Sequence, residues 1–338
     1  MRGALVGTGF FANMQMRAWQ NIAEANIAAV CDLDKDKARA FADTYDIPKV
    51  YSDVDDLLDN EALEFVDIVT RPDSHLLLVE KAAAKGLAIL CQKPLAPTFE
   101  EAQQIVRVSK ESNVPFMVNE NWRWQAWYQE IKKLVETGTL GQLFHATVHM
   151  RTGDGRGENP YSHQPYFKTY PRMLIFETGV HFIDTLRMFL GEVEQVYAVH
   201  RRINANIAGE DFSLITLSFE SGATAVIDAN RYTEPKVKSE AFGRVTLEGL
   251  KGEAMLTRKL SIQVQLNSGE AFEHPYDPSG GYKGRSCEAT QRHFIQSLMS
   301  KTPFQTGGDD YLKTLAVVEA VYASAELGQA VTPNDITI

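Results

Sequence analysis

The chain has 338 residues, of which 44% are hydrophobic and 23% are charged, and its formal net charge is −10. This length predicts two domains of ordinary globular composition. The excess of acidic residues, spread along the chain, argues against nucleic acid or an anionic membrane as a partner.

The cysteines and the apolar runs indicate a cytoplasmic protein. Cys31, Cys91 and Cys287 form no CxxC pair, and the first two end apolar runs, so we expect buried free thiols. The apolar run after Met1 is too short for a signal peptide, and no apolar stretch of the sequence is long enough to span a bilayer.

Short apolar runs alternate with helical patterns over residues 1 to about 120. Such runs are typical of strands that are buried on both faces. One helical pattern opens with Thr98 and Glu101 at capping-box spacing, and another ends at Gly86. Strands that alternate with helices predict an α/β domain with a doubly wound parallel sheet. The expected strands are residues 3–6, 27–31, 65–69, 87–91 and 115–118, and the expected helices are residues 34–45, 74–85 and 98–112.

The pattern changes after about residue 120, so we place the two domains at residues 1–120 and 121–338. Most later segments alternate apolar and polar residues between short turns, which predicts a large open antiparallel sheet with unlike faces. The second domain is therefore expected to be an α+β domain built on that sheet. Its expected strands are residues 143–150, 193–201, 212–219, 223–230, 244–248, 254–258 and 260–266, with helices at 125–137, 176–190, 287–300 and 310–328.

Residues 151–172 have no periodicity and are rich in Gly, Pro and Tyr. A loop of this length inside a compact domain is usually functional or disordered, and its tyrosines favour an ordered loop. We interpret it either as a lid over a substrate pocket or as a surface loop at an oligomer contact. The side chains expected to reach a substrate are Arg156, His163, Tyr166 and Arg172.

A glycine-rich turn follows the first expected strand and opens a helix. Gly7 allows a tight turn, Gly9 allows the backbone to approach a pyrophosphate, and Ala12 keeps helix and strand close. Phe10 and Phe11 complete the GxGxxA pattern. The pattern alone is a weak signal, but its place between a strand and a helix predicts a Rossmann-type dinucleotide site.

Asp32 ends the second expected strand, about 20 residues after the glycines. A carboxylate there accepts hydrogen bonds from the adenosine ribose and repels a 2′-phosphate, so NAD is favoured over NADP as the cofactor. Two observations allow other interpretations of Asp32 and of the cofactor. Asp32 can instead cap the helix that begins near Asp34, and Lys35, Lys37 and Arg39 can accommodate a 2′-phosphate.

Lys93 lies just beyond the expected strand of residues 87–91, where open α/β sheets bind ligands. Pro94 holds Gln92 and Lys93 in an extended conformation. A lysine here can donate to a substrate oxygen and stabilise alkoxide character during hydride transfer. The alternative is an ordinary surface lysine.

Glu177, His181 and Asp184 share one face if residues 176–190 are helical. A histidine beside carboxylates can act as a general acid or base, although a buried structural histidine has the same pattern. A metal would need a third ligand that no cluster supplies, and we interpret His145 and His149 as sheet-surface residues, so no metal site is expected.

The GxGxxA turn, the Lys-Pro-Leu after the expected strand of residues 87–91 and the G-x-H-x-x-D on a later helix occur together. In this combination and order the chain resembles the Gfo/Idh/MocA oxidoreductase family over nearly its whole length. The resemblance implies catalytic roles for Lys93, His181 and Glu177, with the substrate between the nicotinamide and His181. It also implies that the nicotinamide lies near Lys93 and Asn121 and that Arg123 contacts the substrate. The other residues that it implies for the cofactor are Thr70, Pro72, His75 and Gln92.

The chain departs from the family pattern at two site positions. Gln92 stands where the family usually has Glu, which removes a charge beside Lys93. Glu177 stands where Asp is common, and its extra methylene moves the carboxylate by about a bond length. The pocket is therefore expected to suit a substrate other than inositol.

The expected function is an NAD-dependent dehydrogenase that transfers a hydride between the nicotinamide and a secondary alcohol or ketone of a sugar, inositol or sugar acid. The alternatives are an NAD-dependent glycoside hydrolase or epimerase with transient oxidation, and a non-catalytic NAD-sensing regulator. Apolar residues of the late sheet, including Tyr197, Val199, Ile215 and Leu217, predict a homodimer or homotetramer joined through its open face.

Overall fold

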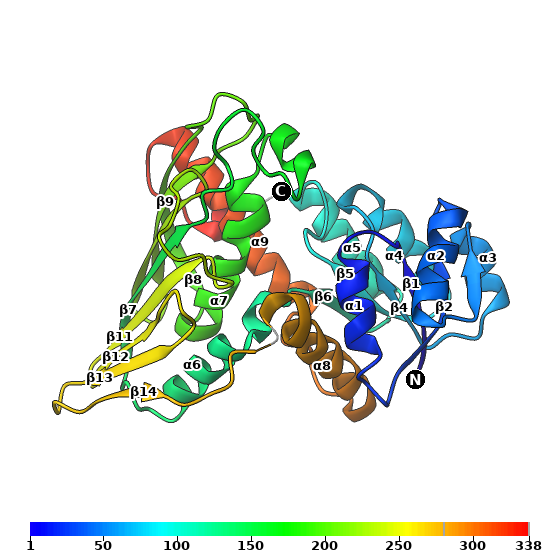
Figure 1. The fold of residues 1–338 in the computed structure, drawn as a ribbon, viewed down its shortest axis with the longest axis horizontal. Coiled ribbons are helices and arrows are strands. Elements are labelled where there is room, and N and C mark those ends of the chain that lie inside the picture. Colours follow the sequence, from blue (N-terminus) through cyan, green and yellow to red (C-terminus); the bar gives the residue numbers. More distant parts are fainter. Residues whose placement is uncertain (280, 337–338) are drawn as a thin grey trace. The chain divides into compact units, whose positions relative to one another are not determined.

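The computed structural model describes residues 1–279 and 281–336, and it divides into two compact units. Unit 1 comprises residues 1–124 and 282–312, and unit 2 comprises residues 125–281 and 313–338. Figure 1 shows the elements along the chain. No helix among the described residues is long and apolar enough to cross a membrane.

Unit 1 contains a six-stranded sheet with the order β3-β2-β1-β4-β5-β6, and every neighbouring pair is parallel. The order reverses between β1 and β4, which is where ligands bind in open α/β sheets. The strands are β1 (Arg2–Val6), β2 (Asn26–Cys31), β3 (Lys49–Tyr51), β4 (Phe65–Ile68), β5 (Ala88–Gln92) and β6 (Phe116–Asn119). The helices are α1 (Ala12–Trp19), α2 (Lys35–Tyr45), α3 (Val54–Asn60), α4 (His75–Ala84), α5 (Phe99–Glu111) and α8 (Ser286–Ser300).

Side-chain caps fix where several of these helices begin. Asp34 accepts a hydrogen bond from the Lys37 amide at the start of α2, and Thr98 accepts one from the Glu101 amide at the start of α5. Asp53 does the same for α3. The sequence therefore specifies these helix starts locally, and the Thr98 cap agrees with the predicted capping box.

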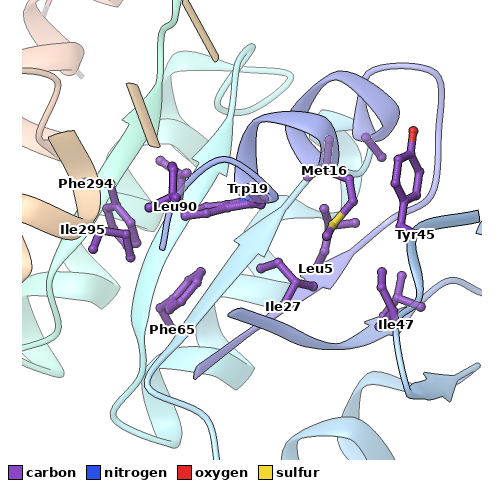
Figure 2. Packing of buried hydrophobic residues seen from close by; sticks show 14 of the residues in the cluster. Leu5, Met16, Trp19, Ile27, Tyr45, Ile47, Phe65, Leu90, Phe294 and Ile295 are labelled. Carbon is purple, nitrogen blue, oxygen red and sulfur yellow. The ribbon is translucent and has the colours of Figure 1, made fainter. Parts of the chain in front are cut away.

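Helix α8 returns from late in the chain to complete the core of unit 1 (Figure 2). The Phe65 ring lies 5.1 Å from that of Trp19 and 5.8 Å from that of Phe294, centroid to centroid. Gly3 leaves room for it, because a Cβ there would lie 2.2 Å from the Phe65 ring. Residues 282–312 therefore pack with the first domain, although the expected division assigned them to residues 121–338.

Unit 2 contains an eight-stranded sheet with the order β14-β13-β12-β11-β7-β10-β9-β8. All neighbouring pairs are antiparallel except β7 and β10, which are parallel, so the sheet is mixed rather than wholly antiparallel. Its strands are β7 (Leu143–Arg151), β8 (Val193–Arg201), β9 (Phe212–Phe219), β10 (Thr224–Asn230), β11 (Gly243–Gly249), β12 (Gly252–Leu256), β13 (Ile262–Leu266) and β14 (Ala271–His274). Its helices are α6 (Ala126–Glu136), α7 (Val180–Leu190) and most of α9 (Gly308–Leu327), with α6 and α7 along one side of the sheet (Figure 1).

The two faces of this sheet differ in exposure. Ile215 and Leu217 are buried, so their expected place on the open face is wrong. They follow the period of the strand to the covered face, and Leu214 points the other way with 42% of its surface exposed. Tyr197, 46% exposed, lies on that same open face, because its register neighbour Thr216 is two residues from Leu214.

Candidate active site

The glycine loop after β1 has the conformation that its sequence predicts. Gly7 has φ +98°, and a Cβ there would lie 2.8 Å from the carbonyl oxygen of Val69, so a side chain does not fit. A Cβ on Gly9 would meet nothing within 4 Å. Ala12 is fully buried at the start of α1, Phe11 precedes it as the N-cap, and Phe10 is 61% exposed. The loop therefore holds its turn by Gly7 and leaves open space beside Gly9 for a ligand.

Asp32 faces this loop directly. Its Oδ2 accepts hydrogen bonds from the Thr8 amide at 2.7 Å and the Thr8 hydroxyl at 2.6 Å, and its Oδ1 accepts one from the Asp34 amide at 3.0 Å. Partial burial raises the pKa of Asp32, but these hydrogen bonds and the nearby Lys37 outweigh it, so the pKa lies below its usual value. The helix cap is Asp34 itself. Asp32 is thus an ionised carboxylate held against the glycine loop. No local sequence motif predicted its hydrogen bonds with Thr8.

Polar amide groups are buried at the carboxyl ends of β5 and β6. Gln92 and Asn119 are neighbours in the parallel register. Gln92 accepts a hydrogen bond from the Lys93 amide at 2.7 Å, while its Nε2 and both amide atoms of Asn119 have no hydrogen-bond partner among the described residues. Buried polar atoms of native proteins normally have partners. Together with the glycine loop and Asp32, these groups fit a polar dinucleotide at this edge of the sheet.

His75 connects the loops that follow β4 and β5. Its Nδ1 lies 2.9 Å from the carbonyl oxygen of Leu95, and its Nε2 lies 3.2 Å from that of Thr70. Burial lowers the pKa of His75 below its ordinary value. Thr70 and Pro72 therefore belong to a loop tied to the segment that carries Lys93. His75 thus supports this edge of the sheet, and its contact with the cofactor stays a prediction.

Asn121 and Arg123 are buried just beyond β6. The Asn121 side chain donates to the Ser286 hydroxyl at 3.0 Å and to Cys287 Sγ at 3.4 Å. Arg123 donates to the Gln305 carbonyl at 3.3 Å and lies 3.7 Å from the Asp310 carboxylate. These contacts lie within unit 1 and connect the end of the parallel sheet to the returning segment of the chain.

Glu177 and His181 lie at the start of the long helix of unit 2. Residues Leu174–Gly179 form π-helical turns, and α7 follows directly, so the expected helix begins with a wider turn than an α-helix has. Glu177 and His181 are 8% and 6% exposed. Asp184 is fully buried and accepts a hydrogen bond from the Thr314 hydroxyl at 3.2 Å. The π-helical turns are of interest because such insertions are frequent at functional sites.

Two side chains that the sequence did not single out hold these turns in place. The buried Glu210 accepts hydrogen bonds from the amides of Met173 and Ile175, at 3.2 and 2.9 Å. The Tyr322 hydroxyl accepts one from the Phe176 amide at 3.2 Å and donates one to Glu210 at 2.7 Å. Glu210 thereby satisfies helix-start amides that have no partner within the helix.

The loop of residues 151–172 is folded against unit 2, with a short helical turn at Pro165–Thr169. Arg156 pairs with Glu234 at 3.1 Å, and His163 is exposed. The half-exposed Tyr166 ring packs on Phe167, with centroids 4.9 Å apart. Arg172 pairs with Glu319 at 2.7 Å and lies 4.1 Å from the centroid of the Tyr322 ring. The proposed substrate residues are therefore spread along an ordered loop, and Arg172 adjoins the segment that leads to Glu177.

Cys31 and Cys91 are buried and free, as expected, and Cys287 is buried and free as well. Over residues 1–279 and 281–336, no group of three or more His, Cys, Asp or Glu side chains is arranged to hold a metal ion. His145 and His149 lie on β7 at positions that are partly exposed, and His145 lies 2.8 Å from the Thr224 hydroxyl of β10.

Comparison with known proteins gives the same family as the motifs. A family model described as an oxidoreductase family with an NAD-binding Rossmann fold matches residues 1–120, and the model of the GFO/IDH/MocA C-terminal domain matches residues 128–254. Two similar proteins are each named D-apiose dehydrogenase. That of Paraburkholderia graminis is 36% identical over 98% of this chain and 89% of its own length, and that of Rhizobium rhizogenes is 35% identical over 98% and 97%.

The chain is also similar to a solved structure of an oxidoreductase from Agrobacterium radiobacter in complex with NAD+, L-tartaric acid and magnesium. The match covers 100% of this chain and 99% of the chain in that structure. It is 33% identical, with a TM-score of 0.94. The chain therefore belongs to the GFO/IDH/MocA family of NAD-binding oxidoreductases.

Proposed function

We propose that this NAD-dependent oxidoreductase is a sugar dehydrogenase whose substrate is a small aldose such as D-apiose, oxidised at one CH–OH group. One observation carries the choice of sugar. Two proteins named for this activity are 36% and 35% identical to the chain over nearly its entire length. Lys93 and His181, the two groups that the family resemblance implies for the chemistry, are both present.

In the proposed reaction, NAD accepts the hydride that leaves the carbon of the CH–OH group. The hydroxyl proton has to leave as the carbonyl forms, and we assign its removal to an imidazole nitrogen of His181. Lys93 keeps its proton and hydrogen-bonds the same oxygen, which stabilises the developing alkoxide. Glu177 orients the His181 ring. The segment held by Glu210 and Tyr322 then supplies the rigid backbone that a positioned base requires.

The reverse assignment makes Lys93 the base, and the pH dependence of kcat/KM separates the two. His181→Ala is expected to lower kcat by about 10²- to 10⁴-fold, the usual contribution of a positioned base, and to leave the Kd for NAD unchanged. Lys93→Met should be comparably damaging. If the His181 variant keeps the wild-type limb near neutrality and the Lys93 variant loses it, lysine is the base.

A substrate panel tests the activity itself. Purified enzyme is incubated with NAD and D-apiose, D-xylose, myo-inositol or L-tartrate, and NADH formation is followed by absorbance. We expect net NADH formation with D-apiose at the highest kcat/KM of the four. Turnover of a sugar without net NADH would favour transient oxidation, as in an epimerase or hydrolase. Binding of NAD with no turnover of any sugar would favour a sensor.

The cofactor preference, the assembly and the location complete the proposal. The ionised Asp32 favours NAD over NADP, because a 2′-phosphate would meet a fixed negative charge. The exposed Tyr197 and Leu214 support a homodimer or homotetramer joined through the open face of the unit 2 sheet. Three buried free thiols suit the reducing cytoplasm. Cell fractionation tests the proposed cytoplasmic location.

A further inference from the structure

Arg231 follows β10 and is 6% exposed, yet its guanidinium contacts two separate parts of unit 2. It donates from Nε to Asp154 Oδ1 at 3.1 Å and from Nη2 to Asp154 Oδ2. From Nη1 it donates to the Thr178 hydroxyl at 3.2 Å. Asp154 belongs to the loop of residues 151–172, and Thr178 lies in the π-helical turns, directly after Glu177. One side chain thus connects the loop to the proposed catalytic segment.

Aromatic rings of the loop enclose the same guanidinium. Its central carbon lies 5.0 Å from the ring centroid of Tyr161 and 5.2 Å from that of Phe167. A planar guanidinium can stack on rings while its edge donates hydrogen bonds, which an ammonium group cannot do. The Asp154 carboxylate and the two aromatic rings therefore favour an arginine at position 231.

The backbone of the loop also contacts the backbone of Arg231. The Gly155 amide donates to the Arg231 carbonyl at 2.8 Å, and the Arg231 amide donates to the Asp211 carbonyl at 2.9 Å. A Cβ on Gly155 would lie 2.9 Å from that Arg231 carbonyl oxygen and 3.0 Å from the Tyr161 hydroxyl. The loop therefore docks on Arg231 through its main chain as well as through Asp154.

The Asp154 carboxylate keeps 40% of its side chain exposed. Partial burial raises its pKa, but the charge and hydrogen bonds of Arg231 outweigh this and lower the pKa below the ordinary value. Asp154 is thus ionised near neutral pH, so its ion pair with Arg231 is intact there.

We propose that Arg231 is a positioning residue that couples the order of the 151–172 loop to the geometry of Glu177 and His181. The inference rests on the proposed function, in which these two residues act on the substrate. In the folded loop, Asp154 and the aromatic rings hold Arg231, and Arg231 in turn holds Thr178 and the turn that carries the proposed catalytic groups. The order of the loop and the geometry of the proposed catalytic segment are thus linked through one side chain.

Hydrogen exchange of the protein without substrate or cofactor tests the coupling apart from activity. Asp154→Asn removes the charged partner in the loop and leaves the π-helical turns untouched in sequence. We expect the amides of residues 174–181 to exchange about 10-fold faster in this variant, a coupling within the range measured for linked sites. Lys168→Gln is the matched control, because the Lys168 ammonium donates to the Glu158 carbonyl within the loop and not to the π-helical turns. Faster exchange confined to the loop in Asp154→Asn would overturn the proposal.

Kinetics of three single variants and one double variant provide a second test. Asp154→Asn and Thr178→Val should each lower kcat by about 10- to 100-fold, the size expected for a misplaced catalytic group, with the Kd for NAD unchanged. In the double variant the two effects should not multiply, because they break one connection. Arg231→Lys should resemble the double variant, since one ammonium cannot bridge both partners. Independent, multiplying effects would contradict the coupling. A wild-type enzyme without activity would refute the proposed function while the exchange result still decides this inference.

Discussion

Replacing Asp32 by asparagine removes one negative charge beside the glycine loop and keeps the size of the side chain. In the native loop the carboxylate accepts three protein hydrogen bonds, from the Thr8 amide, the Thr8 hydroxyl and the Asp34 amide. A carboxylate has about four acceptor sites, so about one remains for a ribose hydroxyl of the cofactor. Asp32→Asn should therefore weaken that bond and remove the repulsion of a 2′-phosphate.

The size of the effect follows from the hydrogen bond that is lost. A hydrogen bond to a charged group contributes about 1.5–3 kcal/mol, so the Kd for NAD should rise by roughly 10- to 100-fold. Affinity for NADP should improve, and the ratio of kcat/KM for NAD to that for NADP should fall by at least as much.

Fluorescence titration with both cofactors measures these changes, and Thr8→Val is the matched control. That variant loses the hydroxyl donor to Asp32 but keeps the carboxylate, so it should weaken NAD slightly and still reject NADP. A wild-type enzyme that prefers NADP, or an Asp32→Asn variant with an unchanged cofactor ratio, would refute the reasoning.

Three further predictions concern the loop, the core and the assembly. Arg172→Ala should raise the KM for the sugar and leave the Kd for NAD unchanged; a lower Tm with an unchanged KM would assign Arg172 to a purely structural role. Asp67 is fully buried, and burial raises its pKa from 3.8 to about 7. Between pH 3.8 and about 7 the Asp67 carboxyl is therefore protonated in the native state and ionised in the unfolded state. Stability should therefore fall as pH rises through this window, by at most about 4 kcal/mol, and urea unfolding of Asp67→Asn should lack this fall. Light scattering at micromolar concentration should give at least twice the mass of one chain, and a monomeric mass would exclude the oligomer.

Local signals in the sequence accounted for most elements of unit 1. Apolar runs marked five of its six strands, and Asp34 and Thr98 marked helix starts that the structure confirms. The short β3 and α3 were not predicted. β3 has only three residues, and α3 has three aspartates among its seven, so neither shows a clear period. Predictions from pattern fail where an element is too short to repeat its pattern.

Contacts between elements that are far apart in the chain could not be predicted from the sequence, for a different reason. The parallel contact of β7 with β10 and the return of α8 to unit 1 depend on which surfaces meet, and strand patterns are alike for both orientations. The same holds for Arg231 and Asp154, which are 77 residues apart, and for Glu210 and Met173, which are 37 apart. Motifs therefore indicated the candidate catalytic groups, whereas the side chains that position them emerged only from the fold.

The measurement that tests the central claim most directly is the fate of a deuterium label. The sugar that gives NADH in the panel is prepared with deuterium on the carbon that is oxidised, and the products are analysed by mass spectrometry. Direct hydride transfer predicts one deuterium in the nicotinamide ring of NADH and none on the oxidised carbon of the product. Unlabelled NADH, or deuterium returned to the sugar without net NADH, would contradict a dehydrogenase.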